Sequence, residues 1–232
     1  MTKETNFEAV RETVLSFLYL DIEKTELSPI LVDHPIFESG IMYNGDQYLN
    51  LFDGGLAEAR KLYCQKIASV SRLEDFLCIM RKAYYLTFLK YTKMALSKTD
   101  FSRLLSTAWT TEERPNDDVN VSVAQAARWF QAADKQALMN LEEYQKYLEL
   151  PDAFTVYRGV TPGHNPNGLS WTCNPDKANW FANRFGKGYI RTGTAKKENV
   201  LAYFTRRGEE EIVISPNDLT SLSIVNSSQF TK

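Results

Sequence analysis

The sequence predicts an α+β fold, with a helical front part in residues 1–150 and a small β-rich part in residues 151–232. Two observations lead to this prediction. Apolar residues recur near the 3.6-residue helical period through the first 150 positions, and short runs of β-branched and aromatic residues follow them. The change comes at Pro151, which cannot continue a helix. Helices followed by a group of strands are typical of an α+β architecture.

In the front part, Pro29 and Pro35 separate the first periodic segment from the rest. Ser122 stands directly before another periodic run, where its hydroxyl can cap a helix. Helices are expected at 4–24, 56–68, 73–96, 101–108, 123–138 and 142–148.

The β-rich part contains one expected helix. Asn174 suits the N-cap, Pro175 suits the first helical position, and Gly186 suits the end. Strands are expected at 154–160, 168–172, 189–194, 199–204, 210–214 and 222–225.

Composition narrows the functional classes. The formal net charge is -2, yet residues 151–232 carry ten Lys and Arg against seven Asp and Glu. This part is therefore the better place for an anionic ligand, although so small an excess does not by itself indicate nucleic-acid binding. The two histidines lie in different regions and the three cysteines lack ligand spacing, so no metal site is expected.

We expect a protein that acts in the cytosol. The first residues include acids and lack the apolar core of a secretory signal, and an odd cysteine count fits a reducing compartment. The most apolar stretch, residues 76–96, is interrupted by four basic residues, which excludes a membrane span.

Three polar motifs in the β-rich part point to chemistry. Arg158 lies inside an apolar β run, where a guanidinium must find an anion or several carbonyls. Ser170 and Thr172 are two residues apart, so on a strand their hydroxyls share a face. Glu209 and Glu211 share a face by the same reasoning, and their repulsion requires a proton or a cation nearby. Taken singly, each motif also fits an ordinary ion pair, strand or acidic turn.

Their order is more specific than any one of them. The segment from about residue 155 to 216 resembles the ADP-ribosyltransferase superfamily, in the Arg-Ser-Glu branch of bacterial and phage mono-ADP-ribosyltransferases. Arg158 matches the first-strand arginine, Ser170-Trp171-Thr172 matches the hydroxyl strand, and Glu209-Glu210-Glu211 matches the Glu-x-Glu element. The resemblance implies a small split β-sandwich that binds NAD, as co-substrate, in a cleft between two small sheets.

The resemblance also implies a role for each matched residue. Glu211 is expected to hold the ribose 2′-hydroxyl and stabilise an oxocarbenium-like transition state. Glu209 is expected to orient or deprotonate the acceptor. Arg158, with the adjoining Gly159, is expected to bind the phosphate or ribose side of NAD. Ser170 and Thr172 are expected to support the nicotinamide ribose and to position Glu211.

Two points of the match stay open. The hydroxyl strand reads Ser-Trp-Thr where the common form is Ser-Thr-Ser, and Ser170 is our choice for the serine role. The aromatic residue that stacks on nicotinamide is Phe181, Phe185 or Tyr189, and the helix face that Phe181 shares with Ala178 also fits core packing. We include Phe181 among the expected cofactor-binding residues.

The function expected from the resemblance is a mono-ADP-ribosyltransferase with a macromolecular acceptor, either a protein side chain such as arginine or RNA. Arg206 and Arg207 lie where the acceptor-recognising loop is expected, and their charge suits phosphates better than an arginine substrate. An NAD glycohydrolase and a catalytically silent binding or inhibitor module are the alternatives. The expected setting is that of a toxin or defence effector neutralised by an antitoxin partner, and residues 1–150 are expected to combine packing with target recognition.

Overall fold

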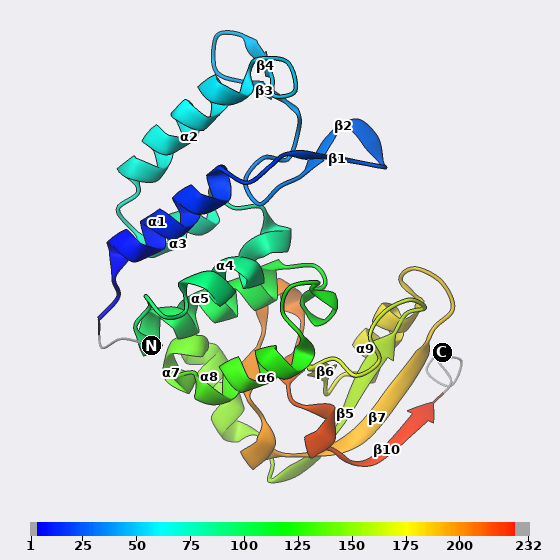
Figure 1. Ribbon diagram of the computed structural model, residues 1–232. Helices are drawn as coiled ribbons and strands as arrows, with labels where there is room; N and C mark the ends of the chain where they lie inside the picture. Colours follow the sequence, from blue (N-terminus) through cyan, green and yellow to red (C-terminus); the bar gives the residue numbers. More distant parts are fainter. Residues whose placement is uncertain (1–3, 226–232) are drawn as a thin grey trace. The chain divides into compact units, whose positions relative to one another are not determined.

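The computed structural model describes residues 4–225 and divides into two compact units, Met1–Leu104 and Leu105–Lys232. The division falls inside the helix α5 (Lys98–Thr111), so the last part of the predicted front region belongs to the same unit as the sheet. The boundary expected from the sequence, at residue 150, lies inside the second unit (Figure 1).

The first unit is a set of helices with two short hairpins. Apolar faces of its helices form the core, and the Arg11 guanidinium donates to the carbonyls of Ile67 and Ala68 at the end of one helix. Its elements are α1 (Phe7–Leu18), β1 (Glu23–Thr25), β2 (Ser28–Asp33), β3 (Ile41–Tyr43), β4 (Tyr48–Asn50), α2 (Leu56–Ser69), α3 (Leu73–Leu77), the 3-10 turn η1 (Lys82–Tyr84), α4 (Tyr85–Thr92) and the start of α5.

Two hairpins follow the first helix, in a stretch where no strand was expected. β1 pairs with β2 and β3 pairs with β4, both antiparallel. Pro29 lies within β2, where its missing N–H is tolerated because both strands of a two-stranded sheet are edge strands. Gly45 takes a φ of 104° in the turn between β3 and β4, a conformation that favours glycine.

The single helix expected at 73–96 was wrong. The chain is helical in α3 and α4, and it is extended at Arg81 between them. The backbone N–H of Arg81 donates to the carbonyl of Pro35, and its guanidinium donates to the carbonyls of Val32 and His34. These tertiary hydrogen bonds compensate for the helical backbone bonds that are lost at the break. The local sequence does not predict them, because their partners lie at residues 32–35.

The second unit places helices around one antiparallel sheet. Its helical elements are the end of α5, η2 (Pro115–Asp117), α6 (Val123–Ala132), α7 (Lys135–Leu138), α8 (Leu141–Glu149), α9 (Pro175–Asn183), η3 (Lys197–Asn199), η4 (Arg206–Gly208) and η5 (Pro216–Asp218). The strands are β5 (Ala153–Val160), β6 (Ser170–Thr172), β7 (Tyr189–Lys196), β8 (Ala202–Phe204), β9 (Glu211–Val213) and β10 (Thr220–Val225). The helix expected at 123–138 is thus divided in two, because Asp134 caps a new helix by accepting from the backbone N–H of Gln136.

The six strands form a single sheet in the order β10-β7-β5-β6-β9-β8. Its two halves, β10-β7-β5 and β6-β9-β8, meet through one residue pair, Tyr157 with Thr172. This corrects the expectation of two separate small sheets, because backbone pairing continues across the junction. The α+β class itself is confirmed.

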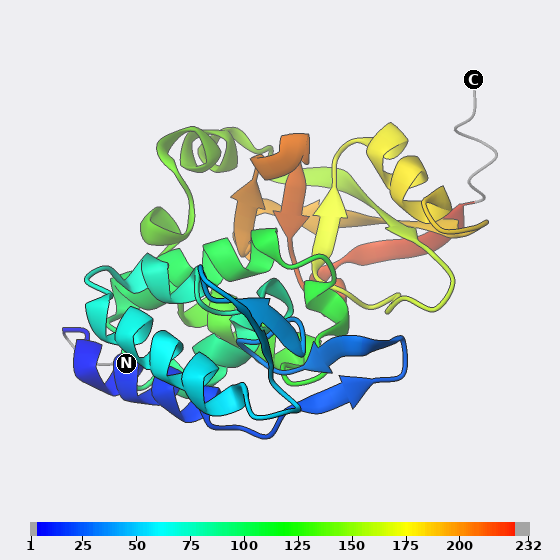
Figure 2. The same cartoon turned by 90° about the horizontal axis from the view of Figure 1, so that it is seen from above.

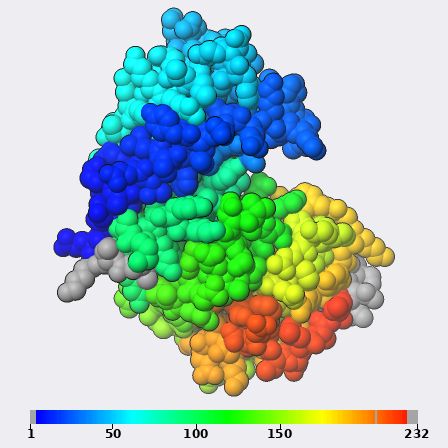
Figure 3. Space-filling view, viewed as in Figure 1, coloured from blue at the N-terminus to red at the C-terminus, as the bar shows by residue number. Residues whose placement is uncertain are grey.

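Helix α9 lies against one face of β5 and β7, as Figure 2 shows. Asn174 and Pro175 begin it as predicted, with the Asn174 side chain accepting from the N–H groups of Asp176 and Lys177. The helix approaches closely because Gly159 on β5 has no side chain: a Cβ there would lie 2.1 Å from the carbonyl oxygen of Ala178. The residues of α6 to α8, green in Figure 3, lie directly against the yellow-to-red residues of the same unit.

Candidate functional site

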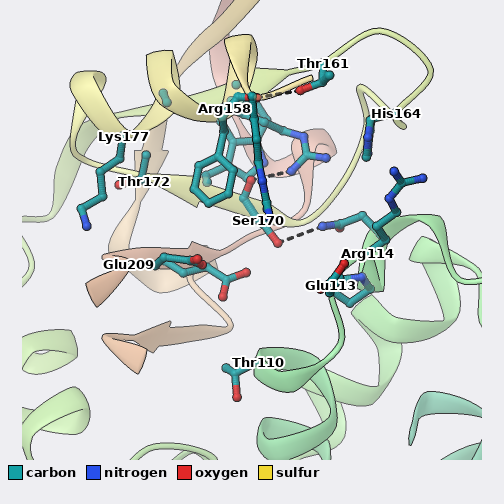
Figure 4. A pocket seen from close by; sticks show the side chains of 18 of the residues that line it. Thr110, Glu113, Arg114, Arg158, Thr161, His164, Ser170, Thr172, Lys177 and Glu209 are labelled. Atoms are coloured by element: carbon teal, nitrogen blue, oxygen red, sulfur yellow. Dashed lines mark hydrogen bonds between the residues drawn. The ribbon is translucent and has the colours of Figure 1, made fainter. Parts of the chain in front are cut away.

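The three motifs meet on three neighbouring strands of the second unit. Arg158 lies on β5, Ser170 and Thr172 on β6, and Glu211 begins β9. The strand register pairs Thr172 with Glu211, and all four residues line one pocket, together with Gly159, Phe181 and Glu209. Figure 4 shows this pocket between the sheet, α9 and the segment that ends α5.

The Arg158 guanidinium is bound to backbone carbonyls. Its Nη1 donates to the carbonyl of Ser170 at 2.7 Å and its Nη2 donates to that of Asn165 at 2.8 Å. Among the described residues its buried Nε has no hydrogen-bond partner. Burial lowers the pKa of Arg158 to about 10, whereas the charges of Asp117 and Glu211 act in the opposite direction. Arg158 therefore joins β5 to β6 and to the preceding loop, and remains a cation beside Glu211 at neutral pH.

The loop before β6 needs a glycine for this arrangement. A Cβ at Gly168 would lie 2.4 Å from Nη2 of Arg158 and 2.6 Å from Cγ of Asn116. A larger residue would therefore displace both side chains that hold Ser170.

Glu211 accepts a side-chain hydrogen bond inside the pocket, because the indole Nε1 of Trp109 donates to its Oε1 at 2.9 Å. The hydroxyl of Ser170 lies on the neighbouring strand of the same pocket and acts to lower the pKa of Glu211. Burial raises the pKa of Glu211 above its usual value, and the negative charge of Glu209 adds to this. The bonds from Ser170 and Trp109 and the charge of Arg158 oppose the rise in this pKa. The carboxyl group is thus desolvated yet surrounded by groups that favour its ionised form.

The two hydroxyls of β6 have different partners. Ser170 Oγ accepts a bond from the Asn116 amide at 2.9 Å, and its hydroxyl acts to lower the pKa of Glu211. Thr172 Oγ1 accepts from the backbone N–H of Asn174, so it stabilises the turn into α9. This difference favours Ser170 over Thr172 for a role at the carboxylate.

Glu209 lies just outside the strand that carries Glu211. It follows the turn η4, in which Gly208 has a φ of 66°, and its backbone N–H donates to the carbonyl of Arg206. Strand alternation is therefore not what places the two carboxylates together, because β9 begins only at Glu211. The turn brings Glu209 to the same pocket (Figure 4).

Arg206 is bound to the protein itself. Its Nε lies 3.4 Å from Oε1 of the fully buried Glu143, and its two terminal nitrogens donate to the hydroxyls of Thr110 and Ser106. This corrects the idea that Arg206 is an open phosphate-binding group. The side chain of Arg207 lies outside the described residues.

The aromatic candidates differ in exposure and place. Phe185 lies at the pocket with its side chain 60% exposed, and its ring stacks on that of His164 at 6.3 Å, 6° from parallel. Phe181 lines the pocket from α9, whereas Tyr189 is not part of its lining. Of the three, Phe185 is the most exposed, and the Arg184 guanidinium lies 4.8 Å from its ring centre.

Sequence reasoning missed the wall supplied by residues 109–117. Trp109 at the end of α5, Asn116 and Asp117 all bond to the site, and the Asp117 carboxylate accepts from the backbone of Asn165 and contacts His164. This stretch reads as a helix end and a turn-rich break. Trp109 was the one residue here from which a contact could have been predicted, since a tryptophan in a core needs a hydrogen-bond acceptor for its indole N–H.

Comparison of the chain with protein-family models, curated proteins and solved structures finds no match. Within residues 4–225, no helix combines the length and the apolar character needed to cross a bilayer.

Proposed function

We propose that this protein is a mono-ADP-ribosyltransferase that cleaves NAD and transfers ADP-ribose to a macromolecular acceptor, with an α+β fold of the ADP-ribosyltransferase type whose two half-sheets stay joined through one residue pair. The observation that carries the proposal is the meeting of Arg158, Ser170 and Glu211 on adjacent strands around one pocket. The order of these residues in the chain supports the family resemblance, and their proximity supports a shared task.

The pocket has the groups that NAD cleavage requires. NAD supplies the bond between ribose and nicotinamide, which breaks with the electron pair leaving on nicotinamide and positive charge developing on the ribose. Glu211 offers a desolvated carboxylate beside that charge, where electrostatic stabilisation is strongest. Arg158 holds a buried cation in the same wall, which suits the anionic part of the dinucleotide. Phe185 offers an accessible ring for stacking.

Glu209 is suited to the second half of the reaction. It shares the pocket with Glu211 but lies on the turn before the strand. The acceptor nucleophile forms the new bond to the ribose carbon, and its proton passes to the Glu209 carboxylate. General-base catalysis of this kind contributes about 10²–10⁴-fold.

The acceptor is a protein side chain or RNA, and the bound state of Arg206 weakens one argument for RNA. That guanidinium pairs with Glu143 and two hydroxyls, so its charge is already compensated. The biological setting that we propose is a toxin or defence effector acting in a cytosol, with a neutralising antitoxin as partner.

The test is incubation of the protein with NAD labelled in the adenylate part and a cell lysate, followed by protease or nuclease digestion. Label lost to protease indicates a protein acceptor, and label lost to nuclease indicates RNA. Free ADP-ribose without labelled macromolecule indicates a glycohydrolase. Absence of NAD consumption would refute the proposal, and a catalytically silent binding or inhibitor module would be the remaining alternative.

Variants give the mechanism its own test. Glu211→Gln should abolish NAD cleavage, and Glu209→Ala should lose acceptor labelling while retaining slow cleavage of NAD. Glu198→Gln is the matched control, because Glu198 is exposed and lies outside the pocket. If Glu211→Gln turned over NAD at the wild-type rate, the assignment of Glu211 would be wrong.

A further inference from the structure

Trp109 reaches the site from the helical segment and makes a fixed contact with Glu211. It lies in the last part of α5 and is 1% exposed, and its ring packs edge-on against Phe130 with ring centres 5.1 Å apart. An indole nitrogen can only donate a hydrogen bond, so the 2.9 Å contact with Glu211 Oε1 has one possible direction. A rigid donor of this kind holds one carboxylate oxygen in place.

Asn116 determines which way the Ser170 hydroxyl points. The backbone N–H of Leu169 donates to the Asn116 side chain at 2.6 Å, which identifies the atom there as the amide oxygen. The amide nitrogen therefore faces Ser170 Oγ at 2.9 Å and can only donate to it. A hydroxyl has a single proton, and with Oγ accepting from Asn116 that proton is available for Glu211.

Ser170 is also held by its backbone. Its carbonyl accepts from Arg158 Nη1 at 2.7 Å, and the strand register places Ser170 opposite Val213 on β9. The main chain of Ser170 is thus fixed from both neighbouring strands. Trp109 and Ser170 reach Glu211 from two different elements, one from α5 and one from β6.

We propose that Trp109 and Asn116 are positioning residues of the active site, which hold the Glu211 carboxylate ionised and in one orientation, Trp109 directly and Asn116 through the hydroxyl of Ser170. The kinetic part of this inference rests on the proposed NAD-cleaving function. The part that concerns the ionisation of Glu211 does not, because it describes the protein without substrate.

Other charged groups line the same pocket and also act on the ionisation of Glu211. Arg158 on β5 favours the ionised form of Glu211, and Glu209 on the turn before β9 disfavours it. Glu112 directly follows the end of α5, and Lys177 lies on α9. None of these groups is changed by the substitutions below, so a difference between variants reports on the hydrogen bonds.

The first test is Trp109→Phe, which keeps an aromatic ring and removes the donor. We expect the pKa of Glu211, measured by carbon-13 NMR of labelled glutamate in the free protein, to rise by about one unit. We expect kcat for NAD cleavage to fall about 10- to 100-fold with KM little changed, and the acidic limb of its pH profile to move to higher pH. Trp129→Phe is the control, since Trp129 is equally buried but lies outside the pocket lining.

The second test separates action through Ser170 from a general loss of structure. Asn116→Ala, Ser170→Ala and the double variant form a mutant cycle on the same NMR pKa. If Asn116 acts through Ser170, Asn116→Ala raises the pKa of Glu211 in the wild-type background and leaves it unchanged in the Ser170→Ala background. Additive shifts would overturn that route.

The two proposals fail in different ways. An unchanged pKa of Glu211 in a folded Trp109→Phe variant would overturn the positioning role, whatever the enzyme does with NAD. A raised pKa in a protein that consumes no NAD would support the positioning of Glu211 and refute the proposed reaction.

Discussion

Glu143 offers the sharpest test of how the site is supported, through the variant Glu143→Ala. Its carboxylate is fully buried in α8, where Oε2 accepts from the backbone N–H of Asn140 at 2.9 Å in a capping box. Oε1 accepts from the backbone N–H of Thr205 at 3.1 Å and lies 3.4 Å from Arg206 Nε. One side chain therefore joins a helix start to the turn that carries Glu209.

The expected loss of stability follows from these bonds. Removal of half a capping box costs about 1 kcal/mol, and a buried N–H without its acceptor, here that of Thr205, costs about 1–3 kcal/mol. The pair with Arg206 adds less than about 1 kcal/mol, because the Arg206 side chain is 32% exposed and solvent screens it. Glu143→Ala should therefore lower the free energy of unfolding by about 2–4 kcal/mol.

The assay is urea unfolding followed by tryptophan fluorescence. All four tryptophans lie within Leu105–Lys232, so the signal reports on the unit that contains the site. Glu142→Ala is the matched control. The Glu142 carboxylate is next to Glu143 in the chain but is 69% exposed, and among the described residues its one ion pair is with Lys146. The control should cost less than about 1 kcal/mol. Equal effects of the two variants would refute the reasoning.

Three further outcomes are expected. Gly159→Ala should destabilise the second unit and lower its urea midpoint, because the new Cβ would lie 2.1 Å from the Ala178 carbonyl oxygen. An unchanged midpoint would mean that α9 can move away from β5 at no cost. Burial raises the pKa of Glu211, so stability falls as pH rises from the ordinary carboxyl pKa of the unfolded chain towards the higher native pKa. Glu211→Gln should therefore be more stable than wild type at pH 7, and the difference in urea midpoint should close below about pH 4. Phe185→Ala should raise the Kd for NAD measured by calorimetry, and it should not lower stability because Phe185 is 60% exposed. Trp180→Ala is the control, since Trp180 is about as exposed but lies outside the pocket lining. Equal Kd values for the two variants would exclude stacking of NAD on Phe185.

Elements with local signals could be predicted from the sequence. Ser122 caps α6, and Asn174 with Pro175 begins α9, because capping depends on residues three or fewer positions away. The strands after residue 151 were located from their β-forming residues, and the matched motifs on three of them line one pocket.

Other features depend on partners distant in the chain and could not be predicted. The break between α3 and α4 is stabilised by bonds from Arg81 to residues 32–35. Arg206, which was expected to recognise the acceptor, pairs instead with Glu143, more than sixty positions earlier. It therefore helps to hold the turn before Glu209 in place.

The sequence by itself determined the kinds of groups at the site and the strands that carry them, since residue type and alternation are local properties. Only the tertiary structure decided how those groups are held. It placed Trp109 and Asn116 beside Glu211 and Ser170, and joined both halves of the sheet at Tyr157. The physical reason is that a buried carboxylate needs donors to remain charged, and one donor to Glu211, Trp109, comes from a helix about a hundred residues away in the chain.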